Sequence, residues 1–307
     1  MNQPIQTNEL KGVYPALMTS MHESGEIDFR KLHMLIDDLI AAGVDGILAC
    51  GTTGQSATLS HEEHIDLVAH VYNYVNGKCM FMAGAGSNCT REAIELTTKI
   101  EERIGPATFL HVTGYYNNPP QEGLIKHYNA ITEAMHPESN LIMYNVPGRT
   151  KSNIESDTAI ELSKNQKIIG IKEASGDLEQ VERIIKGTDS DNFRVMSGED
   201  NLVAKIMDMG GYGVISASAN IAPKLFVELT RFALEGYIET AYKIQEHVNP
   251  LVKAVFCAKN PIPLAHMFDT HLRLPLCRLE RVQAQIDTIL NRYRSEELGI
   301  DLKKYKN

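Results

Sequence analysis

One lysine of the sequence stands where an amine could act as a nucleophile. Lys172 ends the apolar run Ile168–Ile171 and is followed by Glu173-Ala174-Ser175-Gly176. An apolar run that stops at a turn signal is typical of a strand buried on both faces. Burial disfavours an ammonium, so it lowers the pKa of a lysine at the rim of a core. The neutral amine could form a Schiff base with a ketone; alternatively, Lys172 could reach the surface and pair with Glu173.

A tyrosine ends the apolar run that precedes this one along the chain. Tyr144 closes the run Leu141–Tyr144, and Asn145 follows it. If the two runs are adjacent parallel strands, the phenol and the amine meet at the same edge of the sheet. A phenol beside an amine could relay protons while a carbinolamine loses water. The pair therefore favours a Schiff-base site over a tyrosine that only packs.

Polar and glycine-rich segments follow the other apolar runs. In Gly51–Ser56, two threonines stand between glycines, so backbone N–H groups could approach a carboxylate closely, although an ordinary turn can have the same composition. Arg149 follows Tyr144 in the segment Val146-Pro147-Gly148-Arg149. The remaining segments of this kind are Thr113–Pro120, Ser197–Asp200 and Ser216-Ala217.

The spacing of apolar runs predicts the fold. Eight short runs alternate with amphipathic stretches, which favours a parallel (β/α)8 TIM barrel with its active site at the C-terminal ends of the strands. A doubly wound open sheet is the alternative, but no G-x-G-x-x-G follows the first run. The predicted strands are Val13–Met18, Gly46–Cys50, Cys79–Ala83, Thr108–Val112, Leu141–Tyr144, Ile168–Lys172, Arg194–Ser197 and Gly213–Ser216.

Helix signals fill the intervals and the end of the chain. Ser60-x-x-Glu63 predicts a capping box at the start of the second helix. After the last strand, helical patterns run over Leu225–Leu234, Ile238–Phe256 and Leu279–Tyr293. We therefore expect a catalytic barrel over residues 1–220 and a C-terminal helical subdomain over residues 221–307, packed as one structural unit.

Composition excludes several classes of protein. The 307 residues carry a formal net charge of -9 without a dense basic block, which argues against a nucleic-acid partner. No stretch approaches the roughly 18 apolar residues of a membrane span. The N-terminal segment has neither a basic nor an apolar region, so we expect no secretory signal. Five cysteines with irregular spacing and no C-x-x-C predict a reduced, cytoplasmic protein.

Metal and dinucleotide signatures are missing from the sequence. His61 and His64 could share a helix face, but no third ligand lies nearby, and H-E-x-x-H is absent. Gly84-Ala85-Gly86 lacks the rest of a dinucleotide fingerprint. We therefore predict no metal and no cofactor.

From about Gly12 to Pro275, the sequence resembles the pyruvate-dependent class I aldolases, the family of dihydrodipicolinate synthase and N-acetylneuraminate lyase. The motifs that carry this resemblance are Gly51-Thr52-Thr53-Gly54, Tyr144-Asn145-Val146-Pro147 and Gly170-Ile171-Lys172-Glu173-Ala174. It implies a Schiff base on Lys172 and a proton relay of Tyr144, Thr53 and Tyr116, with Tyr116 supplied by a neighbouring subunit. It also implies that Thr52 and Thr53 hold the pyruvate carboxylate, and that Gly198 and Ile215 contribute backbone groups.

Two features resemble the synthase branch of the family. Arg149 stands where synthases bind the carboxylate of L-aspartate 4-semialdehyde, and Tyr115-Tyr116-Asn117 matches a synthase segment. The resemblance thus implies condensation of pyruvate with this aldehyde to 4-hydroxy-tetrahydrodipicolinate, in lysine and diaminopimelate biosynthesis, by a homotetramer built from tight dimers. The alternative is another pyruvate aldolase, which cleaves N-acetylneuraminate or a 2-keto-3-deoxy sugar acid; a third possibility is a non-enzymatic binding protein.

The resemblance also extends to regulation. Lysine-sensitive synthases bind L-lysine at the tight-dimer interface, and the residue types expected there are all present: Ser56, His61, His64, Asn88, Glu92 and Tyr115. We therefore expect feedback inhibition, although these residues could also be ordinary polar groups at helix starts. Two positions depart from the family pattern. Gly114 replaces a common proline, which would loosen its loop, and Gln55 replaces a common glutamate.

Overall fold

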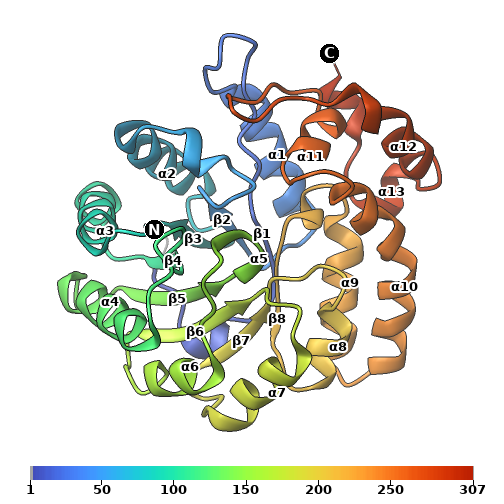
Figure 1. The fold of residues 1–307 in the computed structure, drawn as a ribbon. Helices are drawn as coiled ribbons and strands as arrows, with labels where there is room; N and C mark the ends of the chain where they lie inside the picture. Colours follow the sequence, from blue (N-terminus) through green and yellow to red (C-terminus); the bar gives the residue numbers. More distant parts are fainter. Residues whose placement is uncertain (1–2, 307) are drawn as a thin grey trace.

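The computed structural model describes residues 3–306 and contains one sheet of eight parallel strands. The sheet order is β1-β8-β7-β6-β5-β4-β3-β2, and helices surround the strands on the outside (Figure 1). The predicted (β/α)8 barrel is confirmed. The strands are β1 (Gly12–Pro15), β2 (Gly46–Ala49), β3 (Met80–Gly84), β4 (Thr108–Val112), β5 (Asn140–Asn145), β6 (Ile168–Glu173), β7 (Arg194–Ser197) and β8 (Gly213–Ser216).

The barrel closes between its first two strands through a short contact. Ala16 forms an isolated bridge with Leu48, and the Leu17 amide donates to the Leu48 carbonyl at 2.9 Å. Strand β1 ends at Pro15 and not at the predicted Met18, because the Met18 amide donates to Asn220 Oδ1 at 3.1 Å. The side chain of Asn220 therefore replaces a neighbouring strand as the partner of this backbone.

Helices follow each strand and cover the outer face of the sheet. The predicted capping box of α2 is present: Ser60 Oγ accepts from the Glu63 amide, while the Glu63 carboxylate accepts from the Ser60 amide. The helices of the barrel are α1 (Phe29–Ala41), α2 (His61–Val75), α3 (Thr90–Ile104), α4 (Gln121–Ala134), α5 (Pro147–Thr150), α6 (Ser156–Leu162), α7 (Leu178–Gly187), α8 (Val203–Asp208) and α9 (Pro223–Leu234).

The C-terminal helices lie side by side along one flank of the barrel (Figure 1). They are α10 (Ile238–Val255), α11 (Ile262–Met267), α12 (Glu280–Leu290) and α13 (Ser295–Leu298). Helix α11 was not predicted, because Pro261 and Pro263 interrupt its pattern, although proline is tolerated in a first helical turn. Helix α9 packs against β1 and α8. The division at residue 220 stays a prediction.

Short 3-10 helices complete the described secondary structure. They are η1 (Thr7–Glu9), η2 (Ser56–Thr58), η3 (Ser218–Asn220) and η4 (Leu302–Tyr305). η2 lies between β2 and α2, so it forms part of the loop at the C-terminal end of β2.

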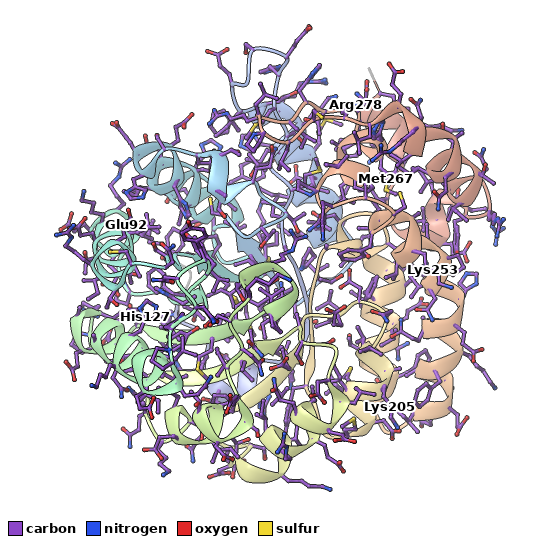
Figure 2. The ribbon with its side chains drawn as sticks, in the orientation of Figure 1. Glu92, His127, Lys205, Lys253, Met267 and Arg278 are labelled. Carbon is purple, nitrogen blue, oxygen red and sulfur yellow. The ribbon has the colours of Figure 1, made fainter. Side chains whose placement is uncertain are left out.

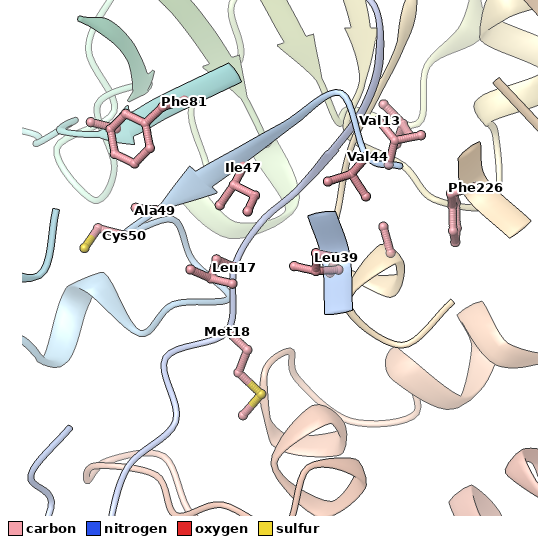
Figure 3. Close-up of a cluster of buried hydrophobic side chains, with 14 of the residues drawn as sticks. Val13, Leu17, Met18, Leu39, Val44, Ile47, Ala49, Cys50, Phe81 and Phe226 are labelled. Carbon is pink, nitrogen blue, oxygen red and sulfur yellow. The ribbon is translucent and has the colours of Figure 1, made fainter. Parts of the chain in front are cut away.

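Apolar side chains are buried on both faces of the strands. In β2, Ile47 belongs to the cluster between sheet and helices (Figure 3), whereas Leu48 belongs to the cluster inside the barrel. Successive residues of a strand point to opposite faces, so both faces need apolar residues. This explains why the strands could be recognised as unbroken apolar runs. Tyr144 belongs to the inner cluster, at the end of the barrel where the strands finish.

Candidate active site

Strand register brings Lys172 and Tyr144 together. The two residues are partners in the β5–β6 ladder, and Lys172 Nζ lies 4.3 Å from the centroid of the Tyr144 ring. Both side chains are buried. The phenol and the amine thus meet at the C-terminal ends of adjacent strands, as their positions in the sequence predicted.

The alternative pairing of Lys172 with Glu173 is wrong. Glu173 is buried, and its carboxylate accepts from the Ser175 amide at 2.7 Å, from Asn145 Nδ2 at 3.0 Å and from Gln180 Nε2 at 3.3 Å. These amides satisfy the carboxylate without a cation. Lys172 is therefore free of a salt bridge to its neighbour in sequence.

Burial sets the protonation of both groups. It lowers the pKa of Lys172 to about 8, an effect that the negative charge of buried Asp200 opposes and the positive charge of Arg149 reinforces. It also raises the pKa of Tyr144 to about 12, although Arg149 and a hydrogen bond with the Thr52 side chain favour the phenolate. Near neutral pH, a fraction of Lys172 is a neutral amine, while Tyr144 remains a proton donor.

The loop after β2 contacts Tyr144 through Thr52. Thr52 hydrogen-bonds to Tyr144, and Thr53 is buried one residue further on. Thr53 Oγ1 accepts a hydrogen bond from Asn260 Nδ2 at 2.9 Å. The two hydroxyls expected from the resemblance therefore face different partners, one on β5 and one in the C-terminal region.

Arg149 is placed by the short helix α5, which follows Tyr144 directly. Its Nη2 donates to the Asn260 carbonyl at 3.3 Å. The guanidinium lines the same cavity as Lys172 and Tyr144. Arg149 is exposed, so its remaining N–H groups can bind an anion in that cavity.

Gly198 packs against Lys172, and Ile215 lies on β8. A Cβ atom on Gly198 would come within 3.1 Å of Lys172 Cε and within 2.7 Å of Ala174 Cβ, so glycine permits the close packing of this loop against the lysine. The Gly198 amide donates to the Glu173 carbonyl at 2.7 Å. The Ile215 side chain is buried inside the barrel, which leaves only its backbone for a polar contact.

A cavity of about 650 Å³ extends from the strand ends to the starts of α2 and α3. Lys172, Tyr144 and Arg149 line one part of it, which we call the strand end. A second part, the loop end, is lined by five of the six residues expected to bind lysine: Ser56, His61, His64, Glu92 and Tyr115. The sixth, Asn88, donates from Nδ2 to the Tyr115 carbonyl at 3.0 Å.

The loop end carries one half-buried acid. Glu92, on α3 (Figure 2), accepts a hydrogen bond from Ser87 Oγ at 2.6 Å. His64 is buried and bonds from Nε2 to the Gly84 carbonyl at 2.7 Å. Burial lowers its pKa, so this histidine is neutral and donates to the carbonyl. The carboxylate of Glu92 is thus the ionic group of this end.

Tyr115 and Tyr116 point to different places although they are adjacent. Tyr115 lines the loop end of the cavity, whereas Tyr116 is 92% exposed and has a φ of 73°. Tyr116 therefore does not meet Tyr144 within its own subunit. Hydrogen bonds from Asn88 to the Tyr115 carbonyl and from Asn117 to the Asn88 carbonyl tie this loop to the start of α3 despite Gly114.

Gln55, the second departure from the family pattern, uses both ends of its amide. Its Nε2 donates to the Thr19 carbonyl at 3.3 Å, and its Oε1 accepts from the Arg273 amide at 3.1 Å. The residue is buried and has a φ of 59°. It therefore joins the loop after β2 to the C-terminal segment that contains Pro275 and Leu276, two further residues of the cavity wall.

Two residues near the site were not predicted to take part in it. Asp200 is buried, and its Oδ2 accepts from the Ser218 amide at 2.7 Å. Asn260 contacts Thr53 and Arg149. Asp200 follows β7 in a segment that the sequence did mark, but Asn260 lies far from every strand end along the chain.

Within residues 3–306, no group of three or more His, Cys, Asp and Glu side chains is arranged to hold a metal ion. In the same part of the chain, no helix is long and apolar enough to cross a membrane.

Comparison with known proteins identifies the family. Residues 9–284 match the model of the dihydrodipicolinate synthetase family. The chain belongs to this family. A relative from Methanocaldococcus jannaschii, a 4-hydroxy-tetrahydrodipicolinate synthase, is 44% identical over 283 residues, which span 90% of this chain and 96% of the relative.

Solved structures agree with this assignment. The chloride-inhibited dihydrodipicolinate synthase from Acinetobacter baumannii, complexed with pyruvate, is 37% identical, and the match has a TM-score of 0.88 and covers 95% of this chain and 100% of that one. The enzyme from Cyanidioschyzon merolae with lysine bound is 34% identical, with a TM-score of 0.87 over 95% of this chain and 99% of that one.

These similarities confirm the predicted activity. The chain is an enzyme of lysine biosynthesis with the activity of a 4-hydroxy-tetrahydrodipicolinate synthase, in preference to a sugar-acid aldolase or a non-enzymatic binding protein. The roles of individual residues follow as proposals.

Proposed function

We propose that the enzyme condenses pyruvate with L-aspartate 4-semialdehyde through a Schiff base on Lys172. The observation that carries this proposal is a buried amine with a pKa of about 8, placed 4.3 Å from the centre of the Tyr144 ring. The neutral amine adds to the ketone carbon of pyruvate, and loss of water from the carbinolamine gives an iminium ion. Removal of a methyl proton then gives an enamine, whose carbon attacks the aldehyde.

Tyr144 is the proton donor and acceptor of these steps. Its pKa, raised by burial to about 12, keeps the phenol protonated when the carbinolamine must lose its hydroxyl as water. In this proposal, Thr53 and Tyr116 pass protons between Tyr144 and solvent. The exposed position of Tyr116 supports the view that it acts in a neighbouring subunit.

Carboxylates of the two substrates bind at different places. Thr52 and Thr53 hold the pyruvate carboxylate beside Lys172. Gly198 and Ile215 contribute backbone groups to the same pocket. Arg149 holds the carboxylate of the aldehyde through charge-assisted hydrogen bonds. Its position on the wall of the same cavity supports this assignment.

Tyr116 implies an oligomer. A relay that needs this side chain from a partner requires a tight dimer, and we propose a homotetramer made of two such dimers. If each subunit receives Tyr116 from its neighbour, a separated subunit has an incomplete relay. Sedimentation velocity of the wild type, combined with activity measured over the range of dissociation, tests this proposal; full activity of a monomer would contradict it.

L-lysine is the proposed inhibitor, bound at the loop end by Ser56, His61, His64, Asn88, Glu92 and Tyr115. The carboxylate of Glu92 supplies the charge that an ammonium group needs, and a relative at 34% identity has been solved with lysine bound. We further propose a cytoplasmic location, in keeping with five free cysteines.

One experiment tests the central proposal. The wild type is incubated with pyruvate and borohydride, and the reduced adduct is located by peptide mass spectrometry. We expect a single modified residue, Lys172. Addition of L-aspartate 4-semialdehyde should lower the amount of trapped adduct, because the aldehyde consumes the enamine. Protein that gains no pyruvyl mass, or gains it on another lysine, would overturn the Schiff-base assignment.

A further inference from the structure

Arg273 joins segments that lie far apart in the sequence. Its Nε donates to the Gly25 carbonyl at 2.7 Å, and its Nη1 donates to the Thr58 carbonyl at 3.0 Å. The two Nη atoms also form a fork with the Glu63 carboxylate, with Nη1–Oε2 at 2.9 Å and Nη2–Oε1 at 2.6 Å. Because these contacts use most of its N–H groups, Arg273 connects parts of the protein and is not free to bind an anion.

The backbone of Arg273 contacts the loop after β2 through Gln55. Its amide donates to Gln55 Oε1 at 3.1 Å, and the Gln55 backbone amide donates in turn to the Thr52 carbonyl at 3.1 Å. Gln55 has a φ of 59°, which is unfavourable for a residue other than glycine and requires support from its surroundings. The Thr52 side chain is hydrogen-bonded to Tyr144. An unbroken series of direct contacts thus links Arg273 to the phenol.

The side chain of Arg273 holds the same loop at its far end. Thr58 is the last residue of η2, and Glu63 lies in the first turn of α2, where its carboxylate also accepts from the Ser60 amide. The hydrogen bonds from Arg273 lower the pKa of Glu63 to about 2, so this pair stays charged near neutral pH. Both ends of the segment Gln55–Thr58 are therefore attached to one arginine.

We propose that Arg273 is a positioning residue that keeps the loop after β2 in the conformation in which Thr52 reaches Tyr144. If the loop shifts, the phenol loses the hydrogen bond with Thr52. The alternative is that Arg273 contributes to stability alone. This inference rests on the proposed roles of Thr52 and Tyr144, and it assigns Arg273 no contact with a substrate.

Arg273→Lys tests the proposal, because it keeps the positive charge and removes the planar fork. An ammonium group cannot reach Gly25, Thr58 and Glu63 in the geometry of a guanidinium, so the loop should shift. We expect kcat to fall about 10- to 100-fold, as much as a misplacement of about 1 Å can cost. KM for pyruvate should rise as well, because the same loop is proposed to hold its carboxylate. A lower melting temperature with unchanged kcat and KM would show a purely structural role and overturn the proposal.

Arg278→Lys is the matched control. Arg278 belongs to the same C-terminal region, and its guanidinium bonds to Asp269 Oδ1 at 2.8 Å and to His266 Nδ1 at 3.4 Å. The substitution is the same, but these contacts lie within the C-terminal region, so kcat should stay near wild type. A comparable fall of kcat in both variants would contradict a specific role of Arg273.

A double-mutant cycle tests whether the effect passes through Thr52. Arg273→Lys is combined with Thr52→Val, which removes the hydroxyl and keeps the shape of the side chain. We expect Arg273→Lys to lower kcat in the wild-type background and to have a much smaller effect in the Thr52→Val background. Equal fold-losses in the two backgrounds would overturn the proposal. If Arg273→Lys does not fold, Glu63→Gln takes its place in the cycle, because glutamine keeps the capping box and removes the charge from the fork.

Borohydride trapping of pyruvate separates this inference from the proposed function. The amine of Lys172 is unchanged in Arg273→Lys, so the adduct should still form on Lys172. Failure of trapping in the wild type would refute the Schiff base. Normal trapping in the wild type, together with an unchanged kcat in Arg273→Lys, would refute only the role of Arg273.

Discussion

The two ends of the cavity are built from different kinds of structure. At the strand end, Lys172 and Tyr144 are buried partners in a β-ladder, so the register of the sheet fixes the distance between them. At the loop end, Ser56, His61 and Tyr115 stand on a 3-10 helix, a helix start and a loop, and are more exposed. The comparison teaches that the residues proposed for covalent chemistry lie on paired, buried strands, whereas those proposed to bind the effector lie outside the sheet on more exposed segments.

Charge also differs between the two ends. Two cations, Lys172 and Arg149, line the strand end, and buried Asp200 lies behind them. Glu92 is the ionic group of the loop end, since His64 is held neutral by burial. A carboxylate substrate is therefore attracted to the strand end and an ammonium group to the loop end. Substitutions at each end should affect different ligands.

The largest effect is expected from Lys172→Ala, which removes the amine of the strand end. Pyruvate trapping and turnover should both be lost, because the variant lacks the buried amine beside Tyr144 that is proposed to form the iminium ion. Lys259→Ala is the matched control: Lys259 also lines the cavity but is exposed, so trapping by this variant should persist. Mass spectrometry after borohydride reduction checks both variants, and a pyruvyl adduct on Lys172→Ala protein would disprove the assignment.

Tyr144→Phe keeps the ring against Lys172 and removes only the hydroxyl. Loss of a general acid–base group costs on the order of 10²–10⁴ in rate, so kcat should fall by that amount while the thermal midpoint changes little. Tyr212→Phe is a suitable control, because Tyr212 packs on Arg194 at the opposite end of the strands. Steady-state kinetics with near-wild-type kcat for Tyr144→Phe would show that the ring only packs.

Arg149→Ala should distinguish the two substrates at the strand end. Each hydrogen bond to a charged group contributes about 1.5–3 kcal/mol, so kcat/KM for L-aspartate 4-semialdehyde should fall at least about tenfold. Pyruvate trapping at a pH where Lys172 is neutral should change much less. Comparable losses for the two substrates in the two assays would mean that Arg149 does not select the aldehyde carboxylate.

Protonation of Lys172 predicts a pH dependence for the first step. The neutral amine is the nucleophile, and the pKa of Lys172 is lowered by burial to about 8. The initial rate of pyruvate trapping should therefore rise about tenfold per pH unit below that value and level off above it. Arg149→Ala should move the midpoint to higher pH, because it removes a positive charge that lowers this pKa. A wild-type rate that still climbs as steeply well above pH 8 contradicts the lowered pKa.

Sequence patterns alone predicted the Lys172–Tyr144 pair of the strand end, whereas the loop end was expected only from the family resemblance, and this difference has a physical reason. A strand buried on both faces has to be apolar, so β6 was visible as a run that stops at Lys172, and adjacency with β5 followed from the barrel. Strand ends were within a few residues of their predicted positions. Where the boundary of β1 was wrong, a side-chain contact from Asn220 had replaced the next strand.

Contacts between distant segments could not be predicted in this way. The bond from Asn260 to Thr53 joins positions 207 residues apart, and nothing periodic surrounds Asn260 in the sequence. The exposed orientation of Tyr116 depends on a positive φ that only the folded loop defines. Residue roles that came from the resemblance, including those of Gly198 and Ile215, remain predictions, although the structure places Gly198 against Lys172.

The smallest effect is expected at the loop end, from Glu92→Ala. Removal of the carboxylate should raise the L-lysine concentration needed for half-inhibition several-fold to about tenfold. This is the change in affinity expected when one partly exposed charge-assisted hydrogen bond is lost. Turnover without lysine and pyruvate trapping should stay near wild type, because Glu92 lies at the other end of the cavity. The control is Glu95→Ala on the same helix, whose carboxylate faces Arg91 at 3.9 Å and does not line the cavity.

Inhibition also requires that lysine bind the inhibited state more tightly than the active one. Tyr115 and Tyr116 make such a difference possible, since one lines the loop end and the other is proposed to act in a neighbour's relay. Titration of both variants with L-lysine, by initial rates and by thermal shift, separates binding from inhibition. If saturating L-lysine changes neither the rate nor the melting temperature of the wild-type enzyme, the loop end is only a polar surface between subunits. The proposed difference in function between the two ends of the cavity would then be wrong.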